Sequence, residues 1–305
     1  MYKCMDDIVE AAKALPQRQR LVVAAAQDRE VLEAVGDAVA WGIVSAVLVG
    51  DREQISSIAA EIDFPLAQCT LIAEKDPILA ARQAVALVAE GQGDLVMKGK
   101  VGTADILRAV LDKEKGLRTG RLLSHVTAFE IQGWGRLLFM TDGAMNIAPD
   151  LGQKAQIAQN AVDVLRGLGF ARPKVAALAA VELVNPDMPA ALEGALLAKM
   201  ADRGQIKDCI VDGPLALDNA ISLHSAQVKG IDSPVAGQAD ILLVPDIEAG
   251  NVLYKAIVYF GKEARVSGVI AGAKAPVVLT SRSDSHQAKL DSIALSAVYA
   301  AGLKS

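Results

Sequence analysis

The chain has 305 residues, of which 52% are hydrophobic but only 4% aromatic, so its core must be built from Ala, Val, Leu and Ile. A formal net charge of −5 disfavours non-specific binding to nucleic acid, which depends on neutralising phosphates. No apolar run reaches the roughly 18–20 residues of a membrane span. No signal segment follows the N-terminus, so we expect a soluble, cytoplasmic protein. Three scattered cysteines argue against a disulfide framework and a structural zinc site.

Short β-branched runs alternate with stretches of helical spacing along the chain. The expected strands are 21–25, 46–50, 94–97, 137–140, 175–178, 210–212, 241–244 and 277–280. Helical spacing occurs at 31–41, 78–89, 104–111, 156–168, 190–200 and 252–261. This alternation predicts an α/β fold with largely parallel sheets covered by helices on both faces. If glycine-rich breaks near 133–136 and 272–276 are crossings, residues 1–135 with 278–305 form a first domain and 136–277 a second.

The first candidate site follows the expected strand 94–97. Lys98 and Lys100 stand among glycines, and Thr103 is the expected N-cap of helix 104–111. The spacing does not fit a Walker-type P-loop, because Gly93 is too far away and the required hydroxyl after Lys100 is missing. Backbone N–H groups of Gly102 and Thr103, with Lys98 or Lys100, could still hold a phosphate. The alternative is a capped helix with solvated lysines.

The second candidate is the loop 116–121. Its Arg118 and Arg121 are flanked by glycines and suit bidentate phosphate contacts, although they could equally be ordinary surface arginines. His125, inside an apolar stretch, is interpreted as a core histidine rather than a catalytic base.

Two further strand ends turn polar. Thr141, with Asp142 and Asn146, is expected at the lip of the sheet. Strand 241–244 stops at Pro245 and opens into a loop and a helix that is expected to begin at Val252. Asn251, and Lys255 one turn later, would lie at this helix N-terminus, where anions are favoured.

The last expected strand runs into a hydroxyl-rich segment, 279–286, which also contains Arg282, Asp284 and His286. Its spacing does not match a hydrolase triad, and no G-x-S-x-G elbow is present. A serine that stabilises developing negative charge beside an arginine that grips phosphate fits better. Since all these segments follow predicted strands, they can converge on one cleft.

Five stretches resemble the phosphate acetyl/butyryltransferase family, from about residue 5 onward. They are 116–121, which looks like the butyryl branch rather than the acetyl branch, and 199–207, 211–218, 239–255 and 275–286. The resemblance implies two α/β domains of the isocitrate/isopropylmalate dehydrogenase-like fold, with the active cleft between them and the first completed by the C-terminal helix. It also implies a homodimer or larger homo-oligomer without metal. The implied reaction is butyryl-CoA plus phosphate giving butyryl phosphate plus CoA, with the CoA thioester as substrate, no other cofactor and no acyl-enzyme.

The resemblance also implies roles for particular residues. Arg282 would clamp phosphate and Ser281 would donate to the oxyanion, while Asn251 and Lys255 would line the cleft. Gly102 and Thr103 would contribute through their helix N-terminus. The acetyl branch places a catalytic Asp seven residues after the Ser of its Ser-Arg pair, where this chain has Ala288. Asp284 is therefore the candidate base, with His286 behind it.

Three alternatives stay open. A same-class rival prefers acetyl, propionyl or a branched acyl group. A metal- and NAD-dependent decarboxylating dehydrogenase would share the fold and would need clustered carboxylates such as Asp212, Asp218 and Asp246. A non-catalytic binding or scaffolding homologue is the third.

Overall fold

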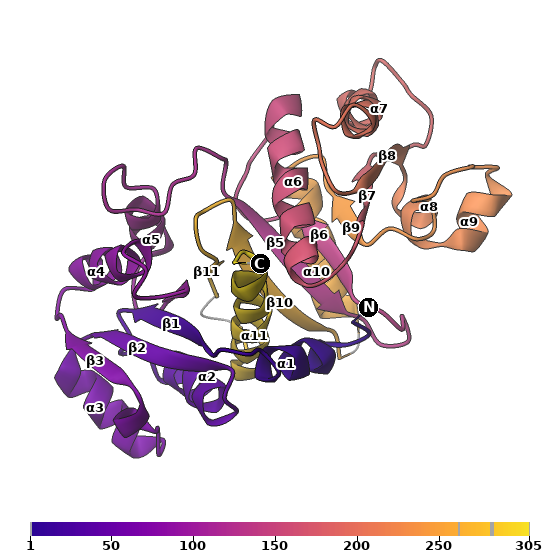
Figure 1. Cartoon of the computed structure of the whole chain (residues 1–305). Helices are drawn as coiled ribbons and strands as arrows, with labels where there is room; N and C mark the ends of the chain where they lie inside the picture. Colours follow the sequence, from indigo (N-terminus) through magenta and orange to yellow (C-terminus); the bar gives the residue numbers. More distant parts are fainter. Residues whose placement is uncertain (1, 262, 281–283, 305) are drawn as a thin grey trace. The chain divides into compact units, whose positions relative to one another are not determined.

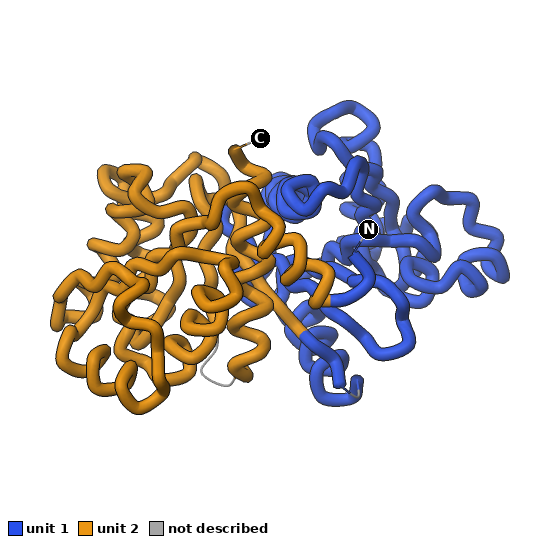
Figure 2. Tube along the Cα trace, turned by 60° about the horizontal axis from the view of Figure 1, so that its bottom comes forward, with its two compact units in different colours: residues 1–4, 122–265 blue, residues 5–121, 266–305 orange. Residues whose placement is uncertain are grey.

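The computed structural model describes residues 2–261, 263–280 and 284–304. The chain forms two compact units (Figure 2). Unit 1 consists of Met1–Cys4 and Leu122–Arg265, and unit 2 of Met5–Arg121 and Val266–Ser305. In unit 2, a C-terminal piece completes the part that holds most of the N-terminal half. The domains 1–135 with 278–305 and 136–277 stay a prediction.

Both glycine-rich breaks that suggested crossings are hairpin turns. Gly133 and Gly135 have positive φ angles, 80° and 77°, in the connection between two antiparallel strands, β5 (Ser124–Glu130) and β6 (Leu138–Thr141). Gly272, with φ 95°, lies between β10 (Arg265–Ala271) and β11 (Val277–Val278), which are also antiparallel. Glycine reaches these φ values without steric cost, so its clustering marked turns within a unit and not the ends of a unit.

Unit 2 contains the strand order β3-β2-β1-β4-β11-β10. All neighbours except β11 and β10 run parallel. The remaining strands are β1 (Gln19–Ala24), β2 (Val44–Gly50), β3 (Thr70–Ala73) and β4 (Leu95–Lys98). The helices are α1 (Met5–Lys13), α2 (Arg29–Ala40), α3 (Arg52–Glu61), η1 (Leu66–Gln68), α4 (Pro77–Ala89), α5 (Thr103–Val110) and α11 (His286–Gly302) (Figure 1). Helix α11 packs against α1 and α2, and α4 packs on β1 and α5.

Unit 1 contains the strand order β5-β6-β9-β7-β8, in which only β5 is antiparallel to its neighbour. Its other strands are β7 (Lys174–Leu178), β8 (Ile210–Leu215) and β9 (Ile241–Leu243). The helices are α6 (Leu151–Gly167), α7 (Pro189–Asp202), α8 (Leu217–Ile221), α9 (Leu223–Val228) and α10 (Ile247–Phe260). The predicted α/β fold with largely parallel strands is confirmed in both units.

The core has the predicted aliphatic character. The interior strands β1, β4 and β9 are almost wholly buried, and Phe129 and Phe139 are the aromatic side chains among the largest fully buried ones. Continuous apolar strands of this kind are typical of parallel sheets, because both faces are covered. Among the described residues, no helix is both long and apolar enough to span a bilayer.

Candidate active site

A cavity of about 440 Å³ opens in unit 2 beyond the carboxyl ends of β1, β4 and β11. Open α/β sheets bind ligands at this edge. The lining residues come from the start of α2 and the loop before it, from α3, the end of β4, the second residue after β11 and the first turn of α11. They are Gln27, Asp28, Arg29, Glu30, Val31, Ile58, Lys98, Gly99, Lys100, Thr280 and Lys289.

Basic side chains dominate the polar lining. Lys98 is only 8% exposed and Lys289 only 2%, and Lys100 stands beside them on the cavity wall. The carboxylates have other partners: Asp28 accepts from the Val31 N–H at 3.1 Å and so caps α2, and Glu30 binds Lys289 at 2.7 Å. The Lys98 ammonium also donates to the Gly99 carbonyl at 3.3 Å. The lining holds four basic side chains, Arg29, Lys98, Lys100 and Lys289, against two carboxylates, so the cavity favours an anion.

Gly99 fixes the position of these two lysines. A Cβ at Gly99 would lie 2.3 Å from the Ala25 carbonyl oxygen, so no other residue fits without displacing backbone. The Gly99 N–H donates to the Ala24 carbonyl at 2.8 Å, and the Lys100 N–H donates to the Ala25 carbonyl at 2.7 Å. These contacts clamp the end of β4 to the end of β1. Gly99 is therefore needed for the close approach of the two strand ends, which the sequence pattern alone does not show.

The helix after this loop begins one position earlier than expected from its predicted cap. Gly102 is the N-cap of α5 and makes no side-chain capping bond, whereas Thr103 is the first helical residue. The prediction that Thr103 is the cap is therefore wrong. The Asp105 carboxylate lies close to Gly102 and also pairs with Arg108 at 2.7 Å. Gly102 and Thr103 are exposed and lie outside the lining of the 440 Å³ cavity.

The loop 116–121 is anchored to the turn that precedes β11. The Thr119 hydroxyl donates to the Gly272 carbonyl at 2.5 Å, and the Lys274 N–H donates to the Leu117 carbonyl at 2.8 Å. The side chains of Arg118 and Arg121 remain exposed on this anchored loop. Arg118 is not among the residues that line the 440 Å³ cavity, so this cavity does not test its predicted phosphate contact.

In unit 1, the end of β6 forms a tight polar turn. Thr141 is fully buried, and its hydroxyl donates to the His125 carbonyl at 2.9 Å. Asp142 accepts from the Ala144 and Met145 N–H groups, both at 3.0 Å, and from the Asn146 amide. These side chains lie at the carboxyl end of β6, the expected edge of the sheet, and their hydrogen bonds hold the turn together. His125 is half-buried with its Nδ1 3.1 Å from the Thr127 hydroxyl, in agreement with the core interpretation.

Helix α10 begins at Ile247, not at Val252 as predicted. Asp246 is its N-cap and accepts from the Ala249 N–H at 2.8 Å, which satisfies an amide of the first turn. Asn251 consequently lies in the second turn, with its amide 3.4 Å from the Gly143 carbonyl. Lys255 follows it on the exposed side, 5.6 Å from the ring centre of Tyr254.

Two glycines allow α10 to approach the turn after β6. A Cβ on Gly250 would lie 2.7 Å from the Gly143 Cα, and one on Gly143 would lie 3.0 Å from the Gly250 carbonyl carbon. Asn251 reaches the turn because of this contact. The structure therefore brings Asp142, Asn251 and Thr141 into one region of unit 1, at the adjacent carboxyl ends of β6 and β9.

The predicted catalytic segment is only partly described. Ser281 and Arg282 lie outside the described residues. The Asp284 carbonyl accepts a hydrogen bond from the Lys289 ammonium, and Ser285 caps α11 by accepting from the Ala288 N–H at 3.1 Å. His286 has its Nε2 3.0 Å from the Asp37 carboxylate on α2.

Sequence reasoning missed Lys289 and the α2 end of the cavity. The available signal for Lys289 was a lone lysine in a helix whose following positions are almost all apolar or small. Its ammonium links Glu30 to the segment that carries Asp284. Within the described ranges, no group of three or more His, Cys, Asp and Glu side chains is placed to hold a metal ion.

A comparison with protein families matches this chain to the phosphate acetyl/butaryl transferases over residues 3–77 and 74–297. The chain is 50% identical to a phosphate butyryltransferase of Clostridium beijerinckii, over 99% of both chains. It is 47% identical to a phosphate acetyltransferase of Thermotoga maritima, over 97% of this chain and 99% of that one.

A solved structure of a branched-chain phosphotransacylase from Enterococcus faecalis superposes with a TM-score of 0.82 at 34% identity. The match covers 92% of this chain and 99% of that chain. Sequence similarity of this extent and a shared fold confirm the resemblance carried by the five stretches. The chain therefore belongs to the phosphate acetyl/butaryl transferase family of acyltransferases.

Proposed function

We propose that this protein transfers a butyryl group reversibly between CoA and inorganic phosphate, in a ternary complex and without a covalent acyl-enzyme. The observation that carries the proposal is the 50% identity, over 99% of both chains, to a phosphate butyryltransferase. The cationic cavity around Lys98 supports it, because both substrates and both products bear phosphate or phosphoanhydride groups.

The proposed reaction is a direct displacement at the thioester carbonyl. A phosphate oxygen attacks the carbonyl carbon, the C–S bond breaks through a tetrahedral oxyanion, and the CoA sulfur leaves as a thiolate that takes up a proton. Lys98 and Arg282 hold phosphate for the attack, and Ser281 donates to the oxyanion. Asp284 takes the proton that the attacking phosphate loses and passes it to the sulfur, and in the reverse direction it removes the proton from the CoA thiol. Arg118, Gly102, Thr103, Asn251 and Lys255 are proposed to contact the substrates, and Thr141 to support the turn beside them.

No metal and no cofactor other than the CoA thioester is part of this proposal. The substrates are small molecules, with no nucleic acid or membrane partner, and the protein is proposed to work in the cytoplasm.

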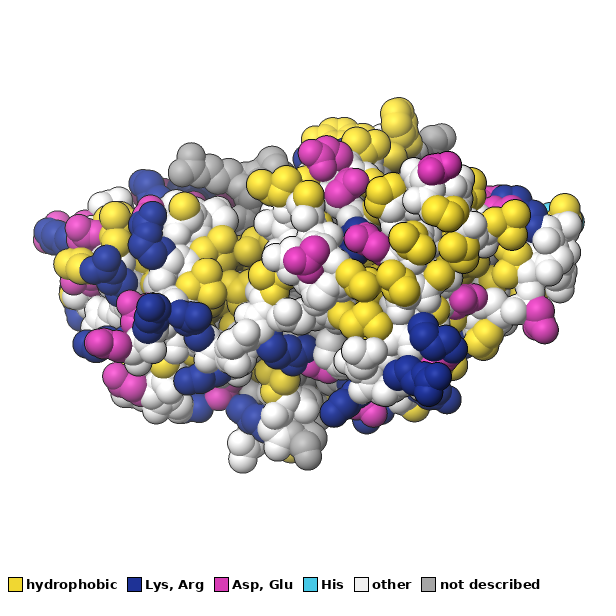
Figure 3. Space-filling model, turned by 90° about the horizontal axis from the view of Figure 1, so that it is seen from above, with side chains coloured by type: hydrophobic (Ala, Val, Ile, Leu, Met, Phe, Trp, Pro, Cys, Tyr) yellow, Lys and Arg dark blue, Asp and Glu magenta, His cyan; other side chains and the backbone are white. Residues whose placement is uncertain are grey.

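Helix α10 supports a homo-oligomer. It is a largely apolar helix of 14 residues in which only Gly250 is buried, and its end exposes 76% of Tyr259 and 87% of Phe260. On the face drawn in Figure 3, hydrophobic side chains also gather in patches between charged ones. Exposed apolar surface of this kind is typical of protein interfaces. We propose that a second copy of the chain covers α10, in a dimer or a larger assembly of dimers.

The choice of acyl group rests on finer distinctions. Relatives of similar identity act on butyryl or acetyl groups by their names, and the solved relative is a branched-chain enzyme. One methylene in an apolar pocket changes transition-state binding by only about 1–3 kcal/mol. A preference for butyryl-CoA within a broad short-chain range is therefore the expected result.

The test is release of CoA, followed with a thiol reagent, from acetyl-, propionyl-, butyryl- and isobutyryl-CoA. Each is assayed with and without phosphate, in the presence of EDTA. We expect phosphate-dependent release that is fastest with butyryl-CoA. Faster release from acetyl- or isobutyryl-CoA would assign a different acyl preference. No release from any of the four would contradict the transferase and favour a scaffold or a dehydrogenase.

A further inference from the structure

A second and larger cavity lies entirely within unit 1, at the opposite edge of its strands from Thr141 and Asn251. Arg136, Lys174 and Asp240 stand at or just before the amino ends of the parallel strands β6, β7 and β9. Strand β6 has four residues, so the two edges are separated by about 13 Å at about 3.3 Å per residue. The cavity measures about 780 Å³. It is therefore separate from the residues of unit 1 proposed to contact the substrates.

The lining of this cavity is positively charged. Arg136, Arg172 and Lys174 supply three cations, against one carboxylate, Asp240. Asp240 is 5% exposed, and its two oxygens accept from the Arg136 guanidinium at 3.2 Å and the Lys174 N–H at 2.9 Å. The Lys174 ammonium donates to a neutral amide, Gln238, at 2.7 Å. Among residues 2–261, 263–280 and 284–304, no carboxylate pairs with the exposed Arg172. The cavity therefore has more positive charges than its one carboxylate can neutralise.

One wall is apolar and aromatic, with its two rings tilted by 45°. Phe170 and Tyr2 lie with ring centres 6.4 Å apart, and Phe139 packs edge-on against Phe170 at 6.0 Å, which fixes the ring. Leu168 completes the wall. An aromatic wall opposite cations suits a ligand with a planar ring and an anionic group, because the ring stacks while the anion pairs. The volume falls within the roughly 300–1,000 Å³ typical of small-molecule sites.

We propose that this cavity binds a nucleoside phosphate. The base lies against Phe170 and Tyr2, and the phosphates pair with Arg136, Arg172 and Lys174. Inorganic phosphate alone would leave the aromatic wall unused, and a nucleoside alone would leave the cations unused. The site is distinct from the acyl-transfer site and does not depend on the proposed reaction.

Trp134 offers a reporter for this site. The chain has two tryptophans, and the Arg136 guanidinium lies 5.8 Å from the Trp134 ring centre. In a Trp41→Phe protein, Trp134 is the remaining tryptophan, so a ligand that draws Arg136 toward its phosphates should change the emission. The full chain is titrated with ADP, and separately with adenosine and with inorganic phosphate, by fluorescence and by calorimetry. Because CoA itself carries an adenosine diphosphate moiety, binding of ADP at a CoA site is told apart by the Arg172 variants and not by competition with CoA.

The proposal predicts saturable ADP binding, with adenosine and phosphate each binding at least tenfold more weakly. Arg172→Glu should raise the Kd for ADP at least tenfold. Arg203→Glu, at an exposed arginine on the end of α7 outside the cavity, should leave it unchanged. If circular dichroism shows that Arg172→Glu does not fold, Arg172→Gln is used instead, because it removes the charge without reversing it. Absence of saturable ADP binding, or an unchanged Kd in a folded Arg172 variant, overturns the proposal, whatever the acyl-transfer assay gives.

Discussion

At the scale of single residues, the side chain that most directly links sequence to site is Lys98. The strand-then-glycine pattern predicted it as a phosphate ligand, and the structure places it in the wall of a cationic cavity with little exposed surface. An exposed lysine would exchange partners freely with water and salt, whereas a buried one is held in place and desolvated. Lys98 therefore discriminates for an anion in a way that surface lysines do not.

Replacing Lys98 with Met should weaken phosphate binding. Met preserves much of the side-chain length and its apolar contacts while removing the charge, so the fold should survive. We expect the KM for phosphate to rise at least tenfold, a loss of about 1.4 kcal/mol or more, with a smaller change in the KM for acyl-CoA. The measurement is steady-state kinetics at varied phosphate. Lys75→Met, at a lysine that is 72% exposed in the same unit, should behave as the wild type. Equal KM values in both variants would remove Lys98 from the site.

Residue-level prediction was uneven for a physical reason. Lys98 and its glycines form one continuous segment, so local pattern was enough to find them. Lys289 reaches the same cavity from a helix far along the chain, and only the folded packing of α11 beside α2 brings it there. Thr141 illustrates the converse. It lies at the end of a strand, as a substrate-binding residue would, yet its hydroxyl donates a hydrogen bond to the His125 carbonyl. The position of a residue along a strand predicts whether it lies at the edge of the sheet, but not which group its side chain hydrogen-bonds.

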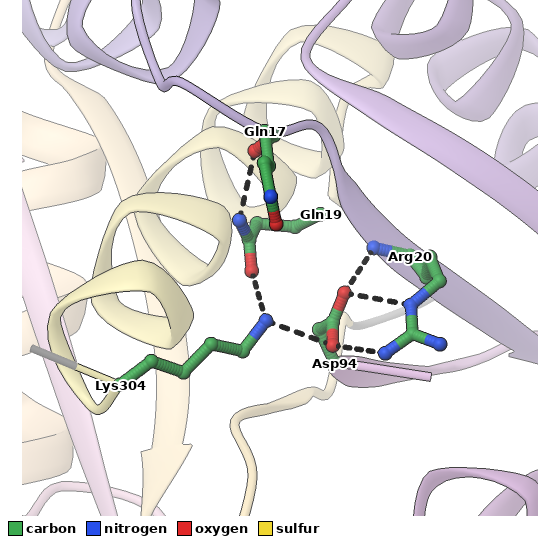
Figure 4. Close-up of polar contacts among 5 residues, drawn as sticks. All are labelled: Gln17, Gln19, Arg20, Asp94 and Lys304. Atoms are coloured by element: carbon green, nitrogen blue, oxygen red, sulfur yellow. Dashed lines mark hydrogen bonds and ion pairs between the residues drawn. The ribbon is translucent and has the colours of Figure 1, made fainter. Parts of the chain in front are cut away.

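At the scale of elements, one carboxylate ties β1, the start of β4 and the end of α11 together. Asp94 accepts from the Arg20 backbone N–H at 2.7 Å and from its guanidinium at 3.1 and 2.8 Å, and it pairs with Lys304 at 2.9 Å (Figure 4). Lys304 also donates to Gln19, at 3.0 Å. Burial by itself raises the pKa of Asp94, but the hydrogen bonds from Arg20 and Lys304 outweigh it and lower the pKa to about 2.

The sign of this shift predicts a stability change with pH. A carboxyl whose pKa is lower in the folded state than in the unfolded chain stabilises the fold above pH 4, and this stabilisation is lost as pH falls from about 4 to about 2. Asp94→Asn should therefore lower the free energy of unfolding by about 1–2 kcal/mol at pH 7, allowing for solvent screening of the partly exposed Arg20. The difference from wild type should shrink below pH 4. Denaturant unfolding between pH 3 and pH 7 measures both effects.

The control for Asp94 is an exposed ion pair. Asp202 pairs with Lys199 on the surface of α7, and Asp202→Asn should leave the free energy of unfolding close to that of the wild type. If Asp94→Asn is equally mild at pH 7, the network in Figure 4 contributes nothing beyond a surface pair.

Element types were easier to predict than element ends. Continuous apolar strands between amphipathic stretches gave the parallel α/β architecture, because burial on both faces imposes that pattern. The start of α10 was misplaced because Pro245, Gly250 and Asn251 suggested a longer loop, whereas the Asp246 cap starts the helix directly after the strand. Gly250 is not a loop residue but the point where α10 crosses Gly143. A glycine required for close approach and one required for a turn look alike in a single sequence.

At the scale of the whole molecule, the exposed apolar end of α10 predicts self-association. A charge placed in an apolar interface opposes its desolvation, so Phe260→Glu should shift the protein toward monomer at micromolar concentration. Sedimentation equilibrium or light scattering after size-exclusion measures the change. Val228→Glu serves as the matched control, since Val228 is also an exposed apolar residue at the end of a helix in unit 1. A wild type that is already monomeric, or equal masses for both variants, would contradict a contact through α10.

The division of the chain between the units has a consequence for its synthesis on the ribosome. Unit 1 takes its strands and helices from one stretch, Leu122–Arg265, which is translated before the rest of β10, β11 and α11 exist. Unit 2 cannot close until those last elements emerge, because α11 packs against α1 and α2, which were made first. The N-terminal third must wait with its apolar surface open while the middle of the chain folds, so the first part made is the last to be completed.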